Sequence, residues 1–150
     1  MPLFPSSRWL WPSLALLVGI AGMSAIWVAA AVLSGSTCSW LGLVAAADMA
    51  LLLRLTNAPA GPGRTIAAVA ATLATLVLAQ WLVVATQIGV VLGMPPIASA
   101  MHLGAHLAWQ LAGLALGRVD WVLLAASPVL SAILASATGA PAPSAPNPGT

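Results

Sequence analysis

Charged side chains are scarce in this sequence, and this scarcity limits the class of protein. The 150 residues include four Arg and two Asp but no Lys and no Glu. Residues 9–47 and 65–117 carry no charged side chain when His is counted as neutral. A soluble domain has about a quarter of its residues charged, because polar side chains must cover its surface. Here only 4% of the residues are charged, which excludes such a domain and indicates a chain embedded in the lipid bilayer.

Several classes of chemistry are excluded by what the sequence does not contain. A single cysteine, Cys38, cannot form an internal disulfide or a CxxC redox or zinc motif. The Arg residues are spread along the chain and form no basic patch, so we expect no nucleic-acid partner. No GxSxG, HExxH, P-loop or paired-carboxylate motif is present, and we therefore expect no enzymatic activity.

Apolar segments of about the length of a bilayer crossing follow one another along the chain. A helix needs about 20 apolar residues to cross a hydrocarbon core of about 30 Å. The sequence therefore predicts an all-α integral membrane protein, a bundle of about five transmembrane helices. The expected spans are residues 13–33, 38–55, 65–93, 97–117 and 121–137. They form a single polytopic domain over residues 1–139, followed by a disordered Pro-rich tail over residues 140–150.

The last and first spans each have an alternative. The fifth span is short and contains Pro128, so we expect a kinked crossing, with a re-entrant or interfacial helix as the alternative. Asp120 is expected to cap the N-terminus of this helix. Arg8, the apolar stretch and the small residues 29–31 also resemble a signal peptide, so cleavage of the first span is an alternative there.

The positions of the Arg residues predict the orientation in the membrane. With five alternating spans, one side of the membrane holds Arg8, Arg54, Arg64 and Arg118. The positive-inside rule makes that side cytoplasmic, and it places the N-terminus there. Together with the composition, this predicts a multi-pass protein of a bacterial inner membrane, with the lipid bilayer as its surroundings.

The seven Trp residues divide into two groups. An aromatic belt at the membrane interfaces is expected to contain Trp9, Trp11, Trp40 and Trp121. Packing positions deeper in the bundle, where each indole N–H needs an acceptor, are expected for Trp27, Trp81 and Trp109.

Polar and small residues share one face of the expected fourth helix. At helical spacing, one narrow arc holds Ser99, His102, His106, Gln110, Gly113 and Gly117. On the expected third helix, Gln80 and Gln87 lie nearly in line. Close helix packing is predicted by two GxxxG pairs, Gly89 with Gly93 and Gly113 with Gly117. We expect these faces to line a cavity; the alternative is that they serve only helix assembly.

Asp48 is the strongest candidate for a functional residue. It lies ten residues after Cys38, where the second span is expected to begin, and so about 15 Å from that end of the helix. The same count from the start of the fourth span places His106 at the same level in the membrane. A carboxylate within a membrane is costly unless it is paired. We therefore expect Asp48 to pair with His106, with Gln80 or Gln110 completing the site. The alternatives are a buried structural pair without function and a protonated Asp48.

A metal site is a further hypothesis. His102 and His106 are four residues apart and can present two imidazoles to one ion, while Cys38 and Met101 are expected on the same outer side. Imidazole with sulfur would suit copper, although another metal fits the same ligands. A haem bound by one His and shared with another chain is a second alternative. The third is that both His residues simply make hydrogen-bonded helix contacts.

Two functions from different classes follow from this pattern. The first is a transport-type or ligand-binding membrane module for a small solute, vitamin or metal ion, with an outward-facing polar site between the second, third and fourth helices. The second is a non-enzymatic accessory or assembly subunit of a larger membrane complex, which includes respiratory complexes that contain haem or copper. In both cases the small size of the chain predicts a homo-oligomer or a membrane-protein partner.

Overall fold

A computed structural model of the chain describes residues 9–93, 95, 98 and 104–137. These residues form helices and no strands, in agreement with the expected all-α class. The helices are α1 (Leu10–Ser34), α2 (Leu41–Leu55), α3 (Pro62–Leu92), α5 (Ala105–Ala115) and α6 (Arg118–Ser136). Three of them, α1, α3 and α6, are long and apolar enough to span a membrane.

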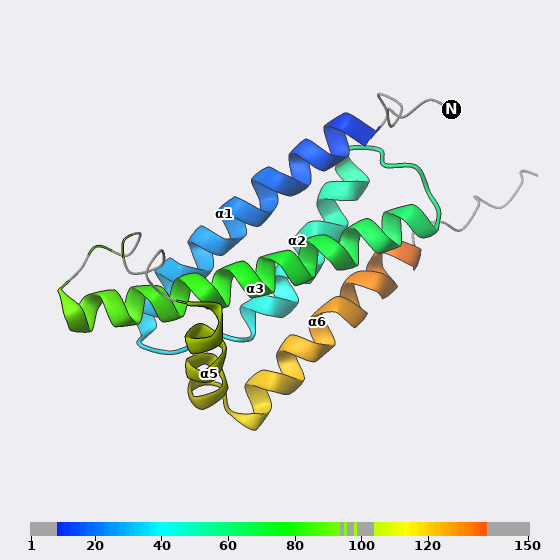
Figure 1. Cartoon of the computed structure of the whole chain (residues 1–150). Coiled ribbons are helices and arrows are strands. Elements are labelled where there is room, and N and C mark those ends of the chain that lie inside the picture. Colours follow the sequence, from blue (N-terminus) through cyan, green and yellow to red (C-terminus); the bar gives the residue numbers. More distant parts are fainter. Residues whose placement is uncertain (1–8, 94, 96–97, 99–103, 138–150) are drawn as a thin grey trace, which may run out of the picture.

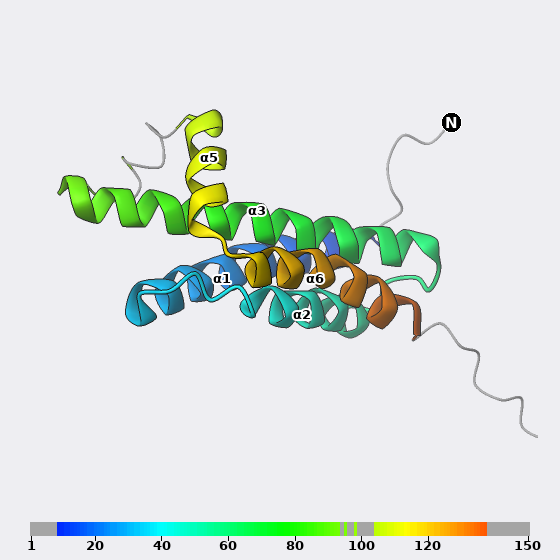
Figure 2. The ribbon, with the colours of Figure 1, turned by 90° about the horizontal axis from the view of Figure 1, so that it is seen from below.

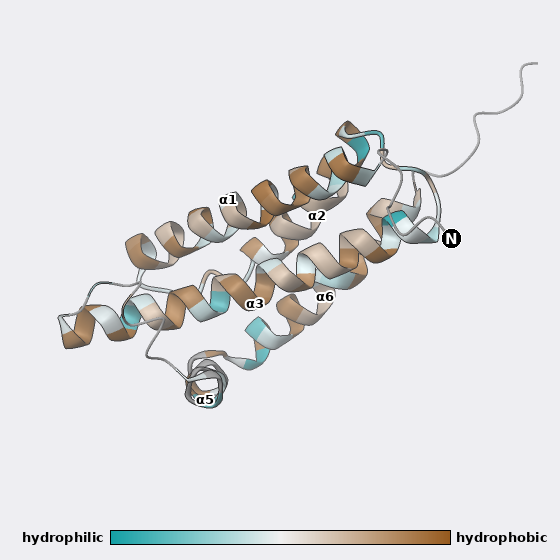
Figure 3. Ribbon diagram, turned by 45° about the horizontal axis from the view of Figure 1, so that its top comes forward, coloured by the Kyte–Doolittle hydropathy of each residue, from teal (hydrophilic) through white to brown (hydrophobic). Residues whose placement is uncertain are grey.

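Four helices form a bundle, and the fifth lies across it (Figures 1 and 2). The helices α1, α2, α3 and α6 run along one axis in alternating directions, and α3 contacts each of the other three. The backbone of α5 approaches only that of α3 among the described helices. Along α1, α3 and α6 the ribbon is mostly hydrophobic, with hydrophilic residues near helix ends and also partway along α3 (Figure 3).

The core lies between α1, α2 and α3. Trp27 and Met49 are both fully buried in it, beside small residues that allow the helices to approach. The indole N–H of Trp27 donates a hydrogen bond to the Thr37 carbonyl, with an N···O distance of 2.9 Å. This contact confirms that Trp27 is a packing residue. It also shows that residues 35–40 fold back beside the last turns of α1, so α2 begins part of the way along the bundle.

Gly42 brings α2 close to its neighbours at that starting point. A methyl group added there would lie 2.7 Å from the Ser127 Oγ of α6, 3.1 Å from a Leu76 methyl of α3 and 3.3 Å from the Trp27 ring. At 2.7 Å a neighbouring atom must shift, and the contacts at 3.1 and 3.3 Å are tighter than most real Cβ contacts. The absence of a side chain at Gly42 is therefore what allows these helices to pack together.

Two arginines, one in the last turn of α2 and one in the first turn of α3, cap the end of α6. The buried Arg64 donates from Nη2 to the Ala135 carbonyl at 2.7 Å, and Arg54 donates from Nη2 to the Leu134 carbonyl at 3.5 Å. The last carbonyls of a helix have no partner within the helix, and positive charge is favourable there. The two Arg side chains thus fix the C-terminal end of α6 to the start of α3.

The expected fourth span over residues 97–117 is not one continuous helix. Gly104 is not helical, and α5 contains only 11 residues, about 16 Å of helix, which is too short for a crossing. Of the α5 side chains, Leu111 packs on Val84 and Ala85 of α3. The helix α5 lies across the bundle, and α6 begins at the end of the bundle opposite to Arg54 and Arg64.

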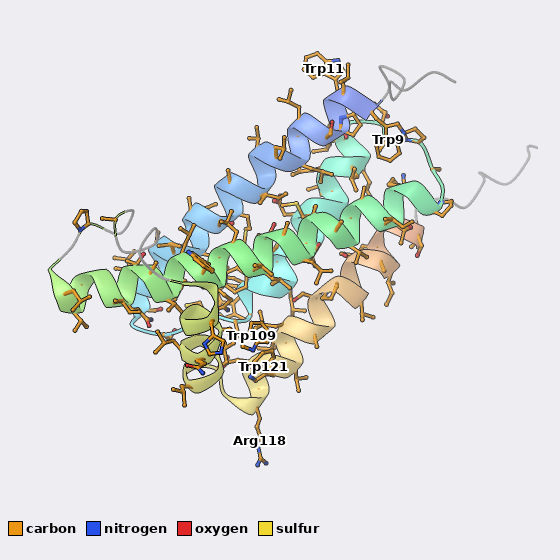
Figure 4. All side chains as sticks on the ribbon, in the orientation of Figure 1. Trp9, Trp11, Trp109, Arg118 and Trp121 are labelled. Atoms are coloured by element: carbon orange, nitrogen blue, oxygen red, sulfur yellow. The ribbon has the colours of Figure 1, made fainter. Side chains whose placement is uncertain are left out.

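The expectation that all Arg residues lie at one end is consequently wrong. Arg54 and Arg64 bond to the end of α6, whereas Arg118 is its first residue and lies at the other end of the bundle (Figure 4). Arg8 lies outside the described residues. The reason is that α5 does not run along the bundle axis. The helix α6 therefore runs in the direction expected for the fourth span, and its first residue, Arg118, lies at the end away from Arg54 and Arg64.

The segment expected over residues 121–137 is part of a longer helix. It begins at Arg118 and ends at Ser136, and it is long and apolar enough to span a membrane. Asp120 does cap this helix, but from its third residue and not as the N-cap itself. Its Oδ2 accepts a hydrogen bond of 2.8 Å from the backbone N–H of Gly117.

Trp residues lie near both ends of the bundle. Trp9 and Trp11 are near one end, and Trp109 and Trp121 are near the other, where their rings meet edge to face with centroids 6.1 Å apart (Figure 4). The position of Trp121 agrees with an aromatic belt. Trp109 was expected deeper, but it is 70% exposed beside Trp121, because α5 does not enter the bundle.

Candidate functional site

Asp48 lies in a groove between α1 and α2. The groove has a volume of about 660 Å³, and Asp48 is the ionisable residue among its lining side chains. Thr56 is also polar, but its hydroxyl already donates to the Leu52 carbonyl at 2.8 Å. The Asp48 side chain is half-buried, and it makes no hydrogen bond or ion pair with another described residue. A carboxyl group in apolar surroundings thus faces an open groove.

Glycines of α1 shape this groove. A methyl group added at Gly19 would clash with Leu52 and lie 3.2 Å from the Met49 methyl, so Gly19 allows α1 and α2 to approach each other. A methyl group added at Gly22 would meet nothing within 4 Å. These two glycines are not among the predicted site residues. Gly19 and Gly22 follow Ala15 by four and seven residues, and this spacing was the available signal because it places three small residues on one helix face.

The structure does not form the expected pair of Asp48 and His106. The helices α2 and α5 do not approach each other, and His106 is exposed on α5. Gly42 of α2 lies beside Leu76 of α3, and α5 packs about eight residues further along α3. Because α2 runs in the opposite direction to α3, Asp48 lies six residues from Gly42 on the side away from α5. At the rise of an α-helix these offsets separate Asp48 from α5 by about 20 Å along the bundle.

The described residues of the polar face of the fourth segment line neither the groove of Asp48 nor the cavity of Gln80. His106, Gln110 and Gly113 share one side of α5 and are all exposed. Ser99, Met101 and His102 lie outside the described residues. The interior site that was expected between the second, third and fourth helices is therefore not assembled in the described part of the chain.

The glycine pairs mostly serve helix ends. Gly89 is buried in α3, but Gly93 has a φ of 66° and terminates that helix. Nothing lies within 4 Å of a methyl group added at Gly113, and Gly117 is the N-cap of α6. The prediction of helix packing is therefore wrong for Gly93, Gly113 and Gly117. Close packing occurs at Gly19 and Gly42 instead.

Gln80 faces a second cavity, which lies between α3, α5 and α6. Its volume is about 460 Å³, and its lining is apolar apart from Gln80 and the indole N–H groups. The Nε2 atom of Gln80 is buried and has no hydrogen-bond partner. Gln87 is exposed on α3. Neither Asp48 nor His106 is among the described residues that line this cavity, and Gln80 therefore belongs to a different site from Asp48.

The expected metal ligands are only partly described. Cys38 is half-buried in the loop after α1, where its Sγ lies 3.1 Å from Ser34 Oγ and 3.3 Å from Ser36 Oγ. His106 is on α5, while Met101 and His102 lie outside the described residues. Among the residues that the structure describes, no group of three His, Cys, Asp or Glu side chains could hold a metal ion.

Two separate sites therefore remain, each with one polar group that lacks a partner. The first is the groove between α1 and α2 with Asp48, and the second is the cavity between α3, α5 and α6 with Gln80. No protein-family model, curated protein or solved structure matches this chain.

Proposed function

We propose that this chain is a non-enzymatic accessory or assembly subunit of a larger complex in a bacterial inner membrane. A transmembrane helix of a partner protein occupies the groove between α1 and α2, and a Lys, Arg or His of that helix binds Asp48. The observation that carries this proposal is the Asp48 carboxyl group, which faces an apolar groove and has no partner among the described residues.

The cost of exposing Asp48 to lipid supports a partner. Asp48 lies in α2, which has 15 residues and packs among the three helices that are long enough to span a membrane. An Asp at this depth opposes insertion by about 2.5–3.5 kcal/mol, and such residues normally face another helix. The groove extends along α1 from Trp11 to Ile26, which is about 22 Å of helix. The open space at Gly22 lets a helix backbone come close. The groove thus has the length and shape that a helix needs.

Charge complementarity favours a different protein over a second copy of this chain. The chain contains no Lys, and Arg54 and Arg64 are already bonded to carbonyls of α6. Arg118 lies at the end of the bundle, and His106 is about 20 Å from the level of Asp48. A copy in the same orientation would therefore bring none of these described cations to Asp48.

The orientation of the bundle follows from the same residues. Arg54 and Arg64 lie at one end, and Arg118 lies with Asp120 at the other. By the positive-inside rule, the end with the two Arg residues faces the cytoplasm. The Trp residues near both ends support this placement in a bilayer.

Site-specific photocrosslinking in native membranes tests the proposal. A photoreactive amino acid replaces Val18, which lines the groove, or Leu33, which is exposed on α1 outside it. We expect a discrete adduct only from position 18, joined to a transmembrane segment that contains Lys, Arg or His. Asp48→Leu should lower its yield roughly tenfold, equivalent to about 1.4 kcal/mol of binding. The matched control, Gln87→Leu, removes an exposed polar group of α3 and should leave the yield unchanged.

Each other outcome contradicts the proposal. An adduct that contains only a second copy of the chain would make the groove a homo-oligomer interface. An adduct whose yield does not depend on Asp48, or whose partner segment contains no cation, would remove the role of the carboxyl group. Equal labelling from positions 18 and 33 would mean that the groove has no specific occupant.

A ligand-binding or transport-type membrane module is the second candidate function. One observation favours it, namely the cavity of about 460 Å³ between α3, α5 and α6. This volume lies within the range of about 300–1,000 Å³ that is usual for small-molecule sites. If this is the function, Asp48→Leu should leave ligand binding unchanged, because Asp48 lies in the other site.

A further inference from the structure

We infer that the cavity between α3, α5 and α6 binds a neutral, mostly hydrocarbon molecule that carries a carbonyl group, and that Gln80 donates a hydrogen bond to this carbonyl. The inference rests on the second candidate function and names the class of ligand for it. It does not depend on a partner in the groove of Asp48, because the two sites have no lining residue in common.

The cavity walls select the hydrocarbon part of the ligand. Leu73 and Val77 of α3 face Leu124 and Pro128 of α6 across the cavity. Among the described lining residues none is charged. A charged ligand group would have no counter-ion in these walls, and burying it there would be costly. The body of the ligand must therefore be apolar and neutral.

Gln80 determines which polar group the ligand must carry. Its Nε2 atom is buried and has no partner, whereas buried amide groups in proteins normally have one. The amide nitrogen can only donate, so its partner must be an acceptor. A carbonyl oxygen is the simplest acceptor in an otherwise apolar molecule. Since Nε2 itself is covered while the Gln80 side chain lines the cavity, a rotation of this side chain brings Nε2 to the ligand carbonyl, and the contact adds no charge.

The short helix α5 forms one wall of the cavity. It is fixed on α3 by Leu111, and it carries Trp109, whose ring meets that of Trp121 edge to face. Trp81 of α3 also lines the cavity. Trp rings are enriched where the hydrocarbon core meets the lipid headgroups, which is also the depth of lipid ester carbonyls. The ligand can thus come from the membrane itself, either as an acyl ester or as a quinone.

Ligand titration of the purified full-length chain in mild detergent tests this inference. The probes are decylubiquinone, with quinone carbonyls, a monoacylglycerol, with an ester carbonyl, and dodecane, which has no acceptor. Binding is followed by Trp fluorescence and by competition between the probes. We expect saturable binding of at least one carbonyl probe, and the probe that displaces the other identifies the source of the ligand.

Substitutions separate the acceptor from the apolar cavity. Gln80→Leu should raise the Kd of the carbonyl probe roughly tenfold and leave the Kd of dodecane unchanged, because it removes the donor but keeps the apolar walls. Gln87→Leu is the matched control, since it removes an exposed amide from the same helix. Ala125→Phe fills the cavity and should abolish binding of every probe. Circular dichroism and size-exclusion chromatography verify that each variant is folded.

The negative outcomes are distinguishable. If dodecane binds as tightly as the carbonyl probes, or if Gln80→Leu leaves their Kd unchanged, the carbonyl requirement is wrong while the ligand-binding function stands. If no probe binds the wild type saturably, or if Ala125→Phe does not reduce binding, both the inference and the second candidate function are wrong. If Gln80→Leu does not fold, the wild-type comparison of carbonyl probes with dodecane still decides the carbonyl requirement.

Discussion

Gly42 and Gly22 should respond in opposite ways to the same substitution. Gly42→Ala places a methyl group 2.7 Å from Ser127 Oγ and 3.1 Å from a Leu76 methyl. Either the Ser127 side chain must move and lose its bond to the Leu123 carbonyl, or α2 and α6 must move apart. Overpacking of this kind costs about 1–3 kcal/mol, and the better helix propensity of Ala returns up to about 1 kcal/mol. At Gly22 the methyl group meets nothing within 4 Å, so only the propensity gain remains.

The expected result is a lower free energy of unfolding for Gly42→Ala, by about 1–2 kcal/mol, and a higher one for Gly22→Ala, by about 0.5–1 kcal/mol. Both are measured on the purified chain in mild detergent by denaturant titration with Trp fluorescence. Ser127→Ala removes the nearest obstructing atom, so the double variant with Gly42→Ala should recover part of the loss. If Gly42→Ala stabilises the chain as much as Gly22→Ala does, the close approach of α2 and α6 is wrong.

Two further predictions concern polar contacts that hold the bundle. Arg64→Met should lower the free energy of unfolding by about 2 kcal/mol, because a charged donor to the Ala135 carbonyl is lost. Hydrogen exchange should then increase mainly in the last turn of α6. A uniform increase over all helices would contradict a local cap. Trp27→Phe should lower the free energy of unfolding by about 1 kcal/mol, because the hydrogen bond to the Thr37 carbonyl is lost. Residues 35–40 should also become more sensitive to proteases. Unchanged cleavage would show that this bond does not hold the loop.

The long helices could be predicted from the sequence because their signals are local. Residues 13–33 and 65–93 were expected as helices, and the structure has Leu10–Ser34 and Pro62–Leu92. Pro62 occupies the first helical position, where its missing N–H costs nothing, and Gly93 ends the helix in a left-handed conformation. Uninterrupted apolar runs with Pro and Gly at their borders determine such elements without reference to the rest of the fold.

The segment over residues 97–117 could not be assigned correctly by the same criteria. Its hydropathy fits a membrane crossing, and equally a short helix that rests on α3 through Leu111. Gly104 interrupts it, but glycine inside an apolar run is also common in transmembrane helices. Which of the two forms depends on contacts with α3, and these contacts are not visible in a local pattern.

The expected site failed for a related reason. The depths of Asp48 and His106 were counted from the start of each segment, which assumes that both helices begin at the same level. Residues 35–40 fold back beside Trp27, so α2 begins deeper, and α5 does not follow the bundle axis. A sequence indicates which polar residues lie in apolar segments, but the level of each one depends on the loops between them.

The attachment of α6 by Arg54 and Arg64 has a consequence for biosynthesis. Both guanidinium groups emerge from the ribosome well before Leu134 and Ala135, whose carbonyls they bind. Until the last turn of α6 has been translated and inserted, these two cations must remain among water and lipid phosphates. The final turn of α6 therefore completes the bundle, and a nascent chain arrested before it should still be open to quality-control proteases.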